Sequence, residues 1–283
     1  MVGDKKTRLL AGILIHSKVF LFEDNSSTSI DHPVNLPFDA ALTTLALAAV
    51  GAFCLGISKT GFPGLAIVNV LIIAELFGAK NSVGIVLPLL IVCDILVYPI
   101  FRKYASWKQV WPLLPPTMLA ITAAWFLLDV IDDVTAKHTI GVIVLVMLAL
   151  QLLREYRKSF LEHLRDSKFF FFGSTILIGV STMLANAAGP VYSIYALVHK
   201  MKKEDFLGIG ARFFLLLNLF KVPFLGAISL INPESLKLDL LLIPGMFAGI
   251  LLGRKLIHLV PQRLFEWLLY GFSLLAGLRL LFK

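Results

Sequence analysis

The stretch Ser58-Lys59-Thr60-Gly61-Phe62-Pro63-Gly64 places polar and helix-breaking residues between two apolar segments. Later in the chain, Ala185-Asn186-Ala187-Ala188-Gly189-Pro190 interrupts another pair of apolar segments in the same way. Irregular backbone at membrane depth is tolerated where it is buried in protein or lines a cavity. The two interruptions therefore predict one unusual element that occurs twice, and we expect the pair to form a binding site.

Composition places the chain in a membrane. Hydrophobic residues make up 58% of the 283 residues, charged residues make up 16%, and the mean hydropathy is +0.86. A water-soluble surface cannot accommodate these values, and the continuous apolar runs lack the alternation of a barrel. We expect an all-α polytopic protein in the lipid bilayer. The net charge of +8 falls in short loops, where lipid headgroups explain it without nucleic acid.

The apolar segments form two sets of five. The first set covers 39–57, 62–77, 82–101, 110–131 and 138–153, and the second covers 169–185, 190–198, 206–230, 238–259 and 264–282. Residue matches support a duplication: Gly84 and Gly208, Asp94 and Asn218, and Pro99 and Pro223 are all 124 positions apart. The predicted organisation is an amino-terminal extension (1–38, an interfacial helix and a linker), repeat 1 (39–153), a cytoplasmic linker (154–168) and repeat 2 (169–283).

An odd number of segments in each repeat makes the second repeat enter the membrane from the opposite side, which gives an inverted repeat. With alternating segments, one side receives fourteen Lys and Arg residues and the other receives four. The positive-inside rule makes the first side cytoplasmic. The predicted cytoplasmic loops are 102–108, 154–168, 199–205 and 254–263. Whether the amino-terminal segment 9–22 crosses the membrane, and whether the interrupted pairs span it or re-enter, both stay open.

The chemistry of the interruptions favours an anion. Glycines permit tight turns, and Pro63 and Pro190 fit the first turn of the helix that follows each interruption. A helix N-terminus carries free amides and a partial positive charge. Lys59 adds a full charge, and hydroxyl and amide side chains add hydrogen-bond donors. The candidate substrate-binding residues of the two interruptions are Ser58, Lys59, Thr60, Gly61, Pro63, Thr182, Asn186, Gly189 and Pro190.

Other polar residues interrupt the apolar segments between the loops. Arg212, Asn218 and Lys221 lie in segment 206–230, where residues 218 and 221 share a helical face and Arg212 lies off it. We include all three as substrate-binding candidates, and Asp94 in segment 82–101 as the candidate coupling group that carries a proton or pairs with a cation. A purely structural pair between Asp94 and Lys221 explains the same residues.

These residues resemble the TauE/SafE sulfite exporter family. The resemblance rests on Gly56-Ile57-Ser58-Lys59-Thr60-Gly61 with Pro63-Gly64, on the run from Thr182 to Pro190, and on Asn218, Lys221 and Pro223, and it covers about residues 40–282. It implies export of a small anion across the bacterial inner membrane, with sulfite, sulfonates or small organic acids as the substrate class.

We therefore expect a secondary transporter that binds a small anion between the two interruptions. No cofactor is expected, no His or Cys spacing is typical of a metal site, and homo-oligomerisation is left open. The alternative hypothesis is an enzyme, an intramembrane lipid-phosphate hydrolase. Only Ser58, Thr60 and Asp94 could serve it as nucleophile or base. A non-transporting membrane scaffold is the third hypothesis, and it leaves the doubled interruption unexplained.

Overall fold

The computed structural model describes residues 38–60, 62, 65–156, 167–256 and 274, and every regular element within them is helical. In chain order these are α2 (Phe38–Ser58), α3 (Leu65–Phe77), α4 (Ala79–Phe101), η2 (Arg102–Tyr104), α5 (Trp107–Val110), η3 (Trp111–Leu113), α6 (Leu114–Val130), α7 (Asp133–Tyr156), α9 (Lys168–Ala185), α10 (Gly189–Val198), α11 (Lys203–Ala227) and α12 (Pro233–Leu256). The predicted segment 9–22 and nearly all of 264–282 lie outside the described residues.

The apolar segments predicted between residues 39 and 259 coincide with these helices, so the all-helical prediction is confirmed. Some helices begin earlier than their apolar run. Helix α7 begins at Asp133, and α11 carries Glu204 and Asp205 in its first turn. Acidic residues suit the positive end of the helix dipole, so polar first turns extend these helices beyond the segments that hydropathy marks.

Five stretches of the described chain are long and apolar enough to cross a membrane. They are Ala79–Tyr104, Trp107–Val130, Lys168–Ala185, Glu204–Ala227 and Pro233–Lys255. A hydrocarbon core is about 30 Å thick and needs about 20 residues of helix. The lengths and compositions of these helices are those of a multi-pass membrane protein.

Each interruption joins two antiparallel helices. The Phe170 ring near the start of α9 lies 6.2 Å from the His199 ring just beyond the end of α10. The start of α9 and the end of α10 therefore lie side by side. In the first pair, a Cβ atom added to Gly51 of α2 would lie 3.3 Å from Nδ2 of Asn69 in α3. Helix α10 has 10 residues and spans about 15 Å at 1.5 Å per residue. It is therefore too short to cross a bilayer alone.

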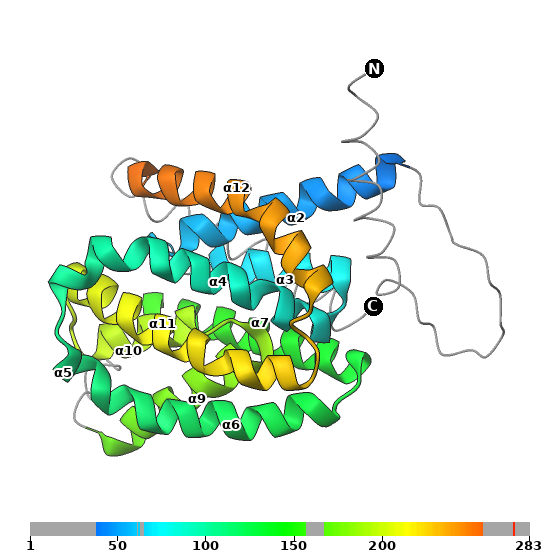
Figure 1. The fold of residues 1–283 in the computed structure, drawn as a ribbon. Helices are drawn as coiled ribbons and strands as arrows, with labels where there is room; N and C mark the ends of the chain where they lie inside the picture. The colour runs from blue at the N-terminus through cyan, green and yellow to red at the C-terminus, as the bar shows by residue number, and fades with distance from the viewer. Residues whose placement is uncertain (1–37, 61, 63–64, 157–166, 257–273, 275–283) are drawn as a thin grey trace.

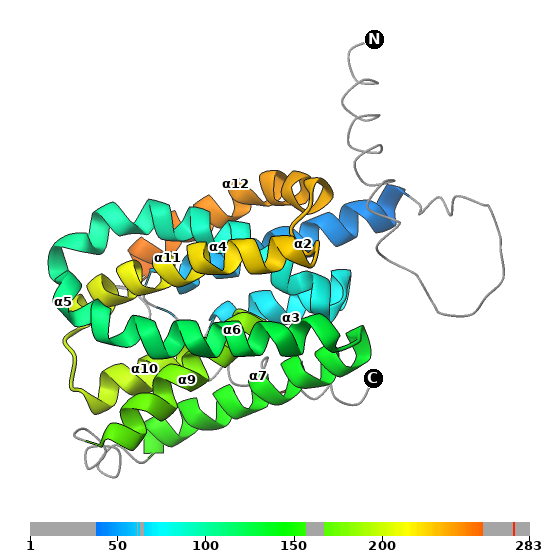
Figure 2. The same ribbon diagram turned by 60° about the horizontal axis from the view of Figure 1, so that its bottom comes forward.

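The central helices α4 and α11 run antiparallel and lie between two outer pairs. Asp94 meets Asn218 near their middle, while Gly84 lies against Leu230 and Gly208 against Ala105 at the two ends. Figure 1 shows α2 and α12 along one side of the bundle and α6 and α9 along the opposite side, and in the turned view of Figure 2 α7 runs along the lower edge beside α9. The contacts between α2 and α12 and between α6 and α9 are the most extensive in the described chain.

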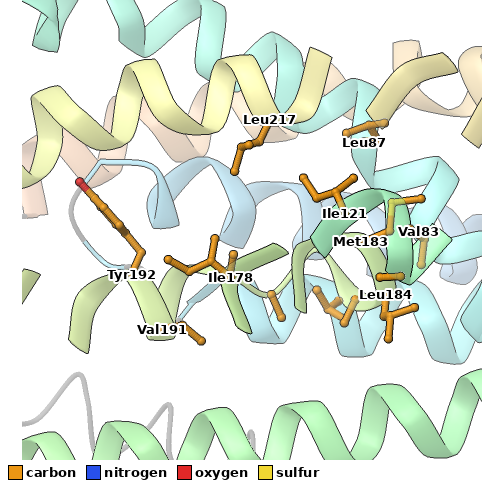
Figure 3. Close-up of a cluster of buried hydrophobic side chains, with 14 of the residues drawn as sticks. Val83, Leu87, Ile121, Ile178, Met183, Leu184, Val191, Tyr192 and Leu217 are labelled. Atoms are coloured by element: carbon orange, nitrogen blue, oxygen red, sulfur yellow. The ribbon is translucent and has the colours of Figure 1, made fainter. Parts of the chain in front are cut away.

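Helix α4 belongs to both large hydrophobic clusters. Val83 and Leu87 join the cluster formed with α6, α7, α9, α10 and α11, part of which Figure 3 shows. Leu89 and Cys93 join a second cluster with α2 and α12. A helix that is apolar all round is a buried helix, and this explains why segment 82–101 has no polar face.

Two glycines set the close approach of α2 and α12. A Cβ atom added to Gly56 would overlap with the carbonyl oxygen of Met246, and one added to Gly249 would overlap with that of Phe53. Because backbone atoms stand in the way, neither position has room for a side chain unless the helices separate.

We expect Gly249→Leu to destabilise the protein by about 1–3 kcal/mol, the usual effect of overpacking a core. The apparent melting temperature of purified protein, followed with a thiol-reactive dye that reaches buried Cys93 on unfolding, measures this. Gly173→Leu in α9 is the control, since nothing lies within 4 Å of a Cβ there. Equal melting temperatures for the two variants would contradict the proposed packing.

Candidate functional site

A central cavity of about 90 Å³ lies where the two interruptions meet α4 and α11. This volume holds several water molecules or a small anion. Its polar lining comes from the end of α2, from α4, from the end of α9 and the residue after it, and from α11: Ser58, Lys59, Asp94, Thr182, Asn186 and Asn218. The structure therefore brings both interruptions to one cavity.

Lys59 follows the last residue of α2 and forms an ion pair with α4. Its Nζ atom lies 2.6 Å from Oδ1 of Asp94, and the exposed fractions of the two side chains are 15% and 1%. The same Nζ atom lies 5.1 Å from the centre of the Phe214 ring. A lysine ammonium has three N–H donors, and in the described part of the chain Asp94 is the only acceptor for Lys59. Two donors are thus free to bind a ligand in the cavity.

Asn186 ends α9 in the left-handed conformation, with φ 51° and ψ 27°. Asparagine adopts this conformation more readily than most residues, which makes it a suitable helix C-cap where glycine is absent. Its backbone N–H donates to the carbonyl of Thr182 at 3.1 Å. Its side-chain Nδ2 donates to the carbonyl of Val83 at 3.0 Å, so the second interruption is fastened to α4.

Lys221 is a fully buried cation with a complete set of partners. Its Nζ atom donates to Oδ1 of Asn186 at 2.6 Å, to the carbonyl of Thr182 at 3.0 Å and to the hydroxyl of Thr182 at 3.2 Å. All three N–H donors are used, and the side chain does not line the cavity. Lys221 therefore positions Asn186 and Thr182 and has no donor left for a ligand.

The two lysines occupy related places with exchanged roles. Lys59 and Asp94 are 35 residues apart, and so are Asn186 and Lys221. In the first pair the cation belongs to the interruption, whereas in the second it belongs to the central helix. Nδ2 of Asn218, one turn before Lys221 on α11, donates to Oδ2 of Asp94 at 2.7 Å, so α11 contributes a residue to each polar pair.

The remaining candidates have different surroundings. Gly189 lines the cavity, whereas Thr60 and Pro190 are buried outside it and the Thr60 hydroxyl donates to the carbonyl of Ile57. Ser58 lines the cavity, but its hydroxyl donates to the carbonyl of Leu55 at 2.7 Å. Gly61 and Pro63 lie outside the described residues.

Arg212 does not reach the cavity. Its guanidinium lies over the rings of Tyr98 and Trp107 and donates to the carbonyls of Gly208 and Arg102. It therefore ties α11 to the corner after α4. In the sequence, the position of Arg212 off the helical face shared by residues 218 and 221 indicated that its side chain points away from theirs.

The partner of Asp94 is Lys59, so the alternative structural pair of Asp94 with Lys221 is wrong. Lys59 and Asp94 are 35 residues apart, as are Asn186 and Lys221, and this shared spacing could have indicated that Lys59 pairs with Asp94. Sequence reasoning also missed the apolar lining, which includes Tyr192, Phe206 and Phe214. Among the described residues, no three His, Cys, Asp or Glu side chains gather in a way that could hold a metal ion.

The fold and the cavity define a class: a helical, multi-pass membrane protein with charged groups buried at its centre. A family model described as "Sulfite exporter TauE/SafE" matches residues 41–280. The chain belongs to this family of membrane transport proteins, and the resemblance seen in the sequence is confirmed. Comparisons with curated proteins and with solved structures give no match.

We expect Lys221→Met to lower the apparent melting temperature, because it leaves Oδ1 of Asn186 buried without a donor. Such a group costs about 1–3 kcal/mol. Lys237→Met is the control, since the Lys237 side chain is 53% exposed and lies 3.7 Å from Glu234 at the surface. A Lys221→Met protein as stable as this control would show that the buried hydrogen bonds contribute nothing.

Proposed function

We propose that the protein is a secondary transporter that exports a small anion, such as sulfite, an organosulfonate or a related organic anion, across the bacterial inner membrane. The observation that carries the proposal is Lys59, whose ammonium lines the central cavity with two free N–H donors. Asn186 and Thr182 face the same space from the second interruption. The anion binds between the two interruptions, and family membership supports its chemical class.

An inverted repeat supplies the two sides of this site. Three observations support the repeat. Helices α4 and α11 are antiparallel, α2 packs on α12 as α9 packs on α6, and the two polar pairs share one spacing. The predicted cytoplasmic loops carry most of the basic residues, so the positive-inside rule assigns which face of the protein is cytoplasmic. Alternating access then follows from rocking one half against the other.

Asp94 is the proposed coupling group, because it competes with the anion for Lys59. When a proton neutralises Asp94, its attraction for Lys59 weakens and the ammonium is free to bind the anion. The proton and the anion then occupy the site together. An anion that leaves alone is instead driven by the membrane potential, at about 2.3 kcal/mol per charge per 100 mV.

The lipid-phosphate hydrolase has less support than transport. Among the described residues that line the cavity, Asp94 is the only carboxylate and no histidine is present. Asp94 is bound by Lys59 and Asn218, and the hydroxyl of Ser58 donates to a backbone carbonyl. These contacts leave no activated nucleophile beside the anion position.

We expect Lys59→Ala to lower sulfite flux into or out of proteoliposomes about tenfold or more, since a hydrogen bond to a charged group contributes about 1.5–3 kcal/mol. Asn186→Ala should also lower the flux, and Lys237→Ala at the surface is the matched control. Rates are compared at equal amounts of reconstituted protein, and the melting temperature of each variant shows that it is folded. Undiminished flux in both cavity variants would overturn the site assignment.

For the coupling group, we expect Asp94→Asn to keep measurable anion flux and to lose its dependence on an imposed pH gradient. The reason is that asparagine cannot exchange a proton at this position. The measurement is flux at a fixed membrane potential with and without the gradient. A variant that responds to the gradient like the unmodified protein would exclude Asp94 as the coupling group.

A further inference from the structure

A basic corner joins α4 to α6 at one end of the bundle, where both ribbon views place α5 (Figures 1 and 2). The corner consists of η2, α5 and η3 and covers residues 102–113. The stretches Ala79–Tyr104 and Trp107–Val130 are each long and apolar enough to cross a membrane, and the corner links the end of one to the start of the other. It therefore lies at the membrane surface, at the level of the lipid headgroups.

The positive charges of the corner have no negative partner. Arg102, Lys103 and Lys108 are exposed, and residues 95–128 contain no Asp or Glu. None of the three forms an ion pair within the described chain. Arg212 of α11 is buried against the corner, and its Nε atom has no hydrogen-bond partner among the described residues. Four cations without a carboxylate attract an anion to this part of the surface.

Aromatic rings lie among these cations. Tyr104, Trp107 and Trp111 are exposed, and the Trp107 and Trp111 ring centres are 6.4 Å apart. Tryptophan and tyrosine favour the membrane interface, where the ring contacts acyl chains and its N–H or O–H group contacts headgroups. Leu119 of α6, about two turns beyond Trp111, is 73% exposed and continues the apolar surface along the same span. The corner thus combines charge for a headgroup with an apolar surface for the chains attached to it.

The corner is held in one conformation. The backbone N–H of Ser106 donates to Oε1 of Gln109 at 2.8 Å and forms a capping box at the start of α5. Arg212 donates to the carbonyls of Arg102 and Gly208. A Cβ atom added to Gly208 would overlap with backbone atoms of the corner, so α11 lies directly against it. Charges that are already in place bind a ligand with little cost of ordering.

The other predicted cytoplasmic loops lack this combination of residues. Loops 154–168 and 199–205 contain Asp or Glu residues beside their cations. Loop 254–263 contains no acidic residue, but it also contains no Phe, Trp or Tyr. The general excess of positive charge on one side of the protein therefore does not account for the corner.

We propose that the basic corner is a binding site for an anionic phospholipid, with the lipid phosphodiester on Arg102, Lys103 and Lys108 and the lipid chains beside Trp107 and Trp111. Free phosphate shares the headgroup chemistry, but it would leave the exposed rings unused. The proposal is independent of the anion that the protein transports.

The test is native mass spectrometry of the full-length protein in detergent, titrated with phosphatidylglycerol or with phosphatidylcholine of the same acyl chains. We expect phosphatidylglycerol to have a dissociation constant about tenfold lower or more, since each cation near an anionic headgroup contributes about fivefold. Replacing Arg102, Lys103 and Lys108 together by Gln should abolish this preference. The backbone carbonyl that Arg212 binds remains in this variant.

A matched control removes the same number of charges from other loops: Lys202→Gln, Arg254→Gln and Lys255→Gln together should keep the preference. Trp111→Ala changes no charge at a side chain that is 62% exposed. It should weaken binding of phosphatidylglycerol several-fold and leave binding of glycerol 3-phosphate unchanged. The melting temperature of each variant shows that it is folded, and Lys108→Gln alone, with an expected loss of about fivefold, replaces the triple variant if that protein does not fold.

Equal affinity for the two lipids would overturn the proposal. The same loss of preference in the corner variant and in the matched control would show a general attraction to basic loops instead of a site. If glycerol 3-phosphate binds the corner as tightly as phosphatidylglycerol does and Trp111→Ala has no effect, the site takes free phosphate and the lipid assignment is wrong. None of these results bears on anion flux, so the proposed function is tested separately.

Discussion

Asp94 is buried between two donors, the ammonium of Lys59 at 2.6 Å and the amide of Asn218 at 2.7 Å. A carboxylate that loses its partner inside a protein destabilises it by about 3–5 kcal/mol. This constraint organises the centre of the bundle. It holds the end of α2 against α4, and it holds α4 against α11 near the middle of both helices. The cavity lies where these contacts meet, and Lys59, Asp94 and Asn218 all line it.

The helices could be predicted from sequence because their signals are local. Glycine and proline mark the interruption before α10, and the predicted start at Pro190 differs from the observed start at Gly189 by one residue. The starts of α7 and α11 were predicted too late, since acidic first turns are polar and hydropathy does not distinguish them from loops. The order of segments and the family were also within reach of the sequence.

The pairing of charges and the lining of the cavity could not be predicted from sequence, because they depend on which residues far apart in the chain come together in the fold. Hydropathy cannot decide which of two lysines reaches Asp94, and the wrong alternative placed Lys221 there. Nor can it separate a phenylalanine that faces lipid from one that faces a cavity: Phe169 of α9 is 89% exposed, whereas Phe213 is fully buried and its neighbour Phe214 lines the cavity. The spacing of 35 residues, shared by both polar pairs, indicated the pairing of the charges but not the lining of the cavity.

The exchanged roles of the two lysines give the two halves different tasks. Asn186 accepts from Lys221 at Oδ1 and donates one of its two Nδ2 N–H groups to the carbonyl of Val83, so its side chain is held from two sides. That side of the cavity is rigid, because moving it would break several buried hydrogen bonds at once. Within the described residues Lys59 has a single acceptor, Asp94, and its side chain is partly exposed, so the proposed anion would compete with Asp94 for its ammonium. For the proposed transporter we therefore expect rearrangement on anion binding at Lys59, whose ion pair with Asp94 can be exchanged for one with the anion.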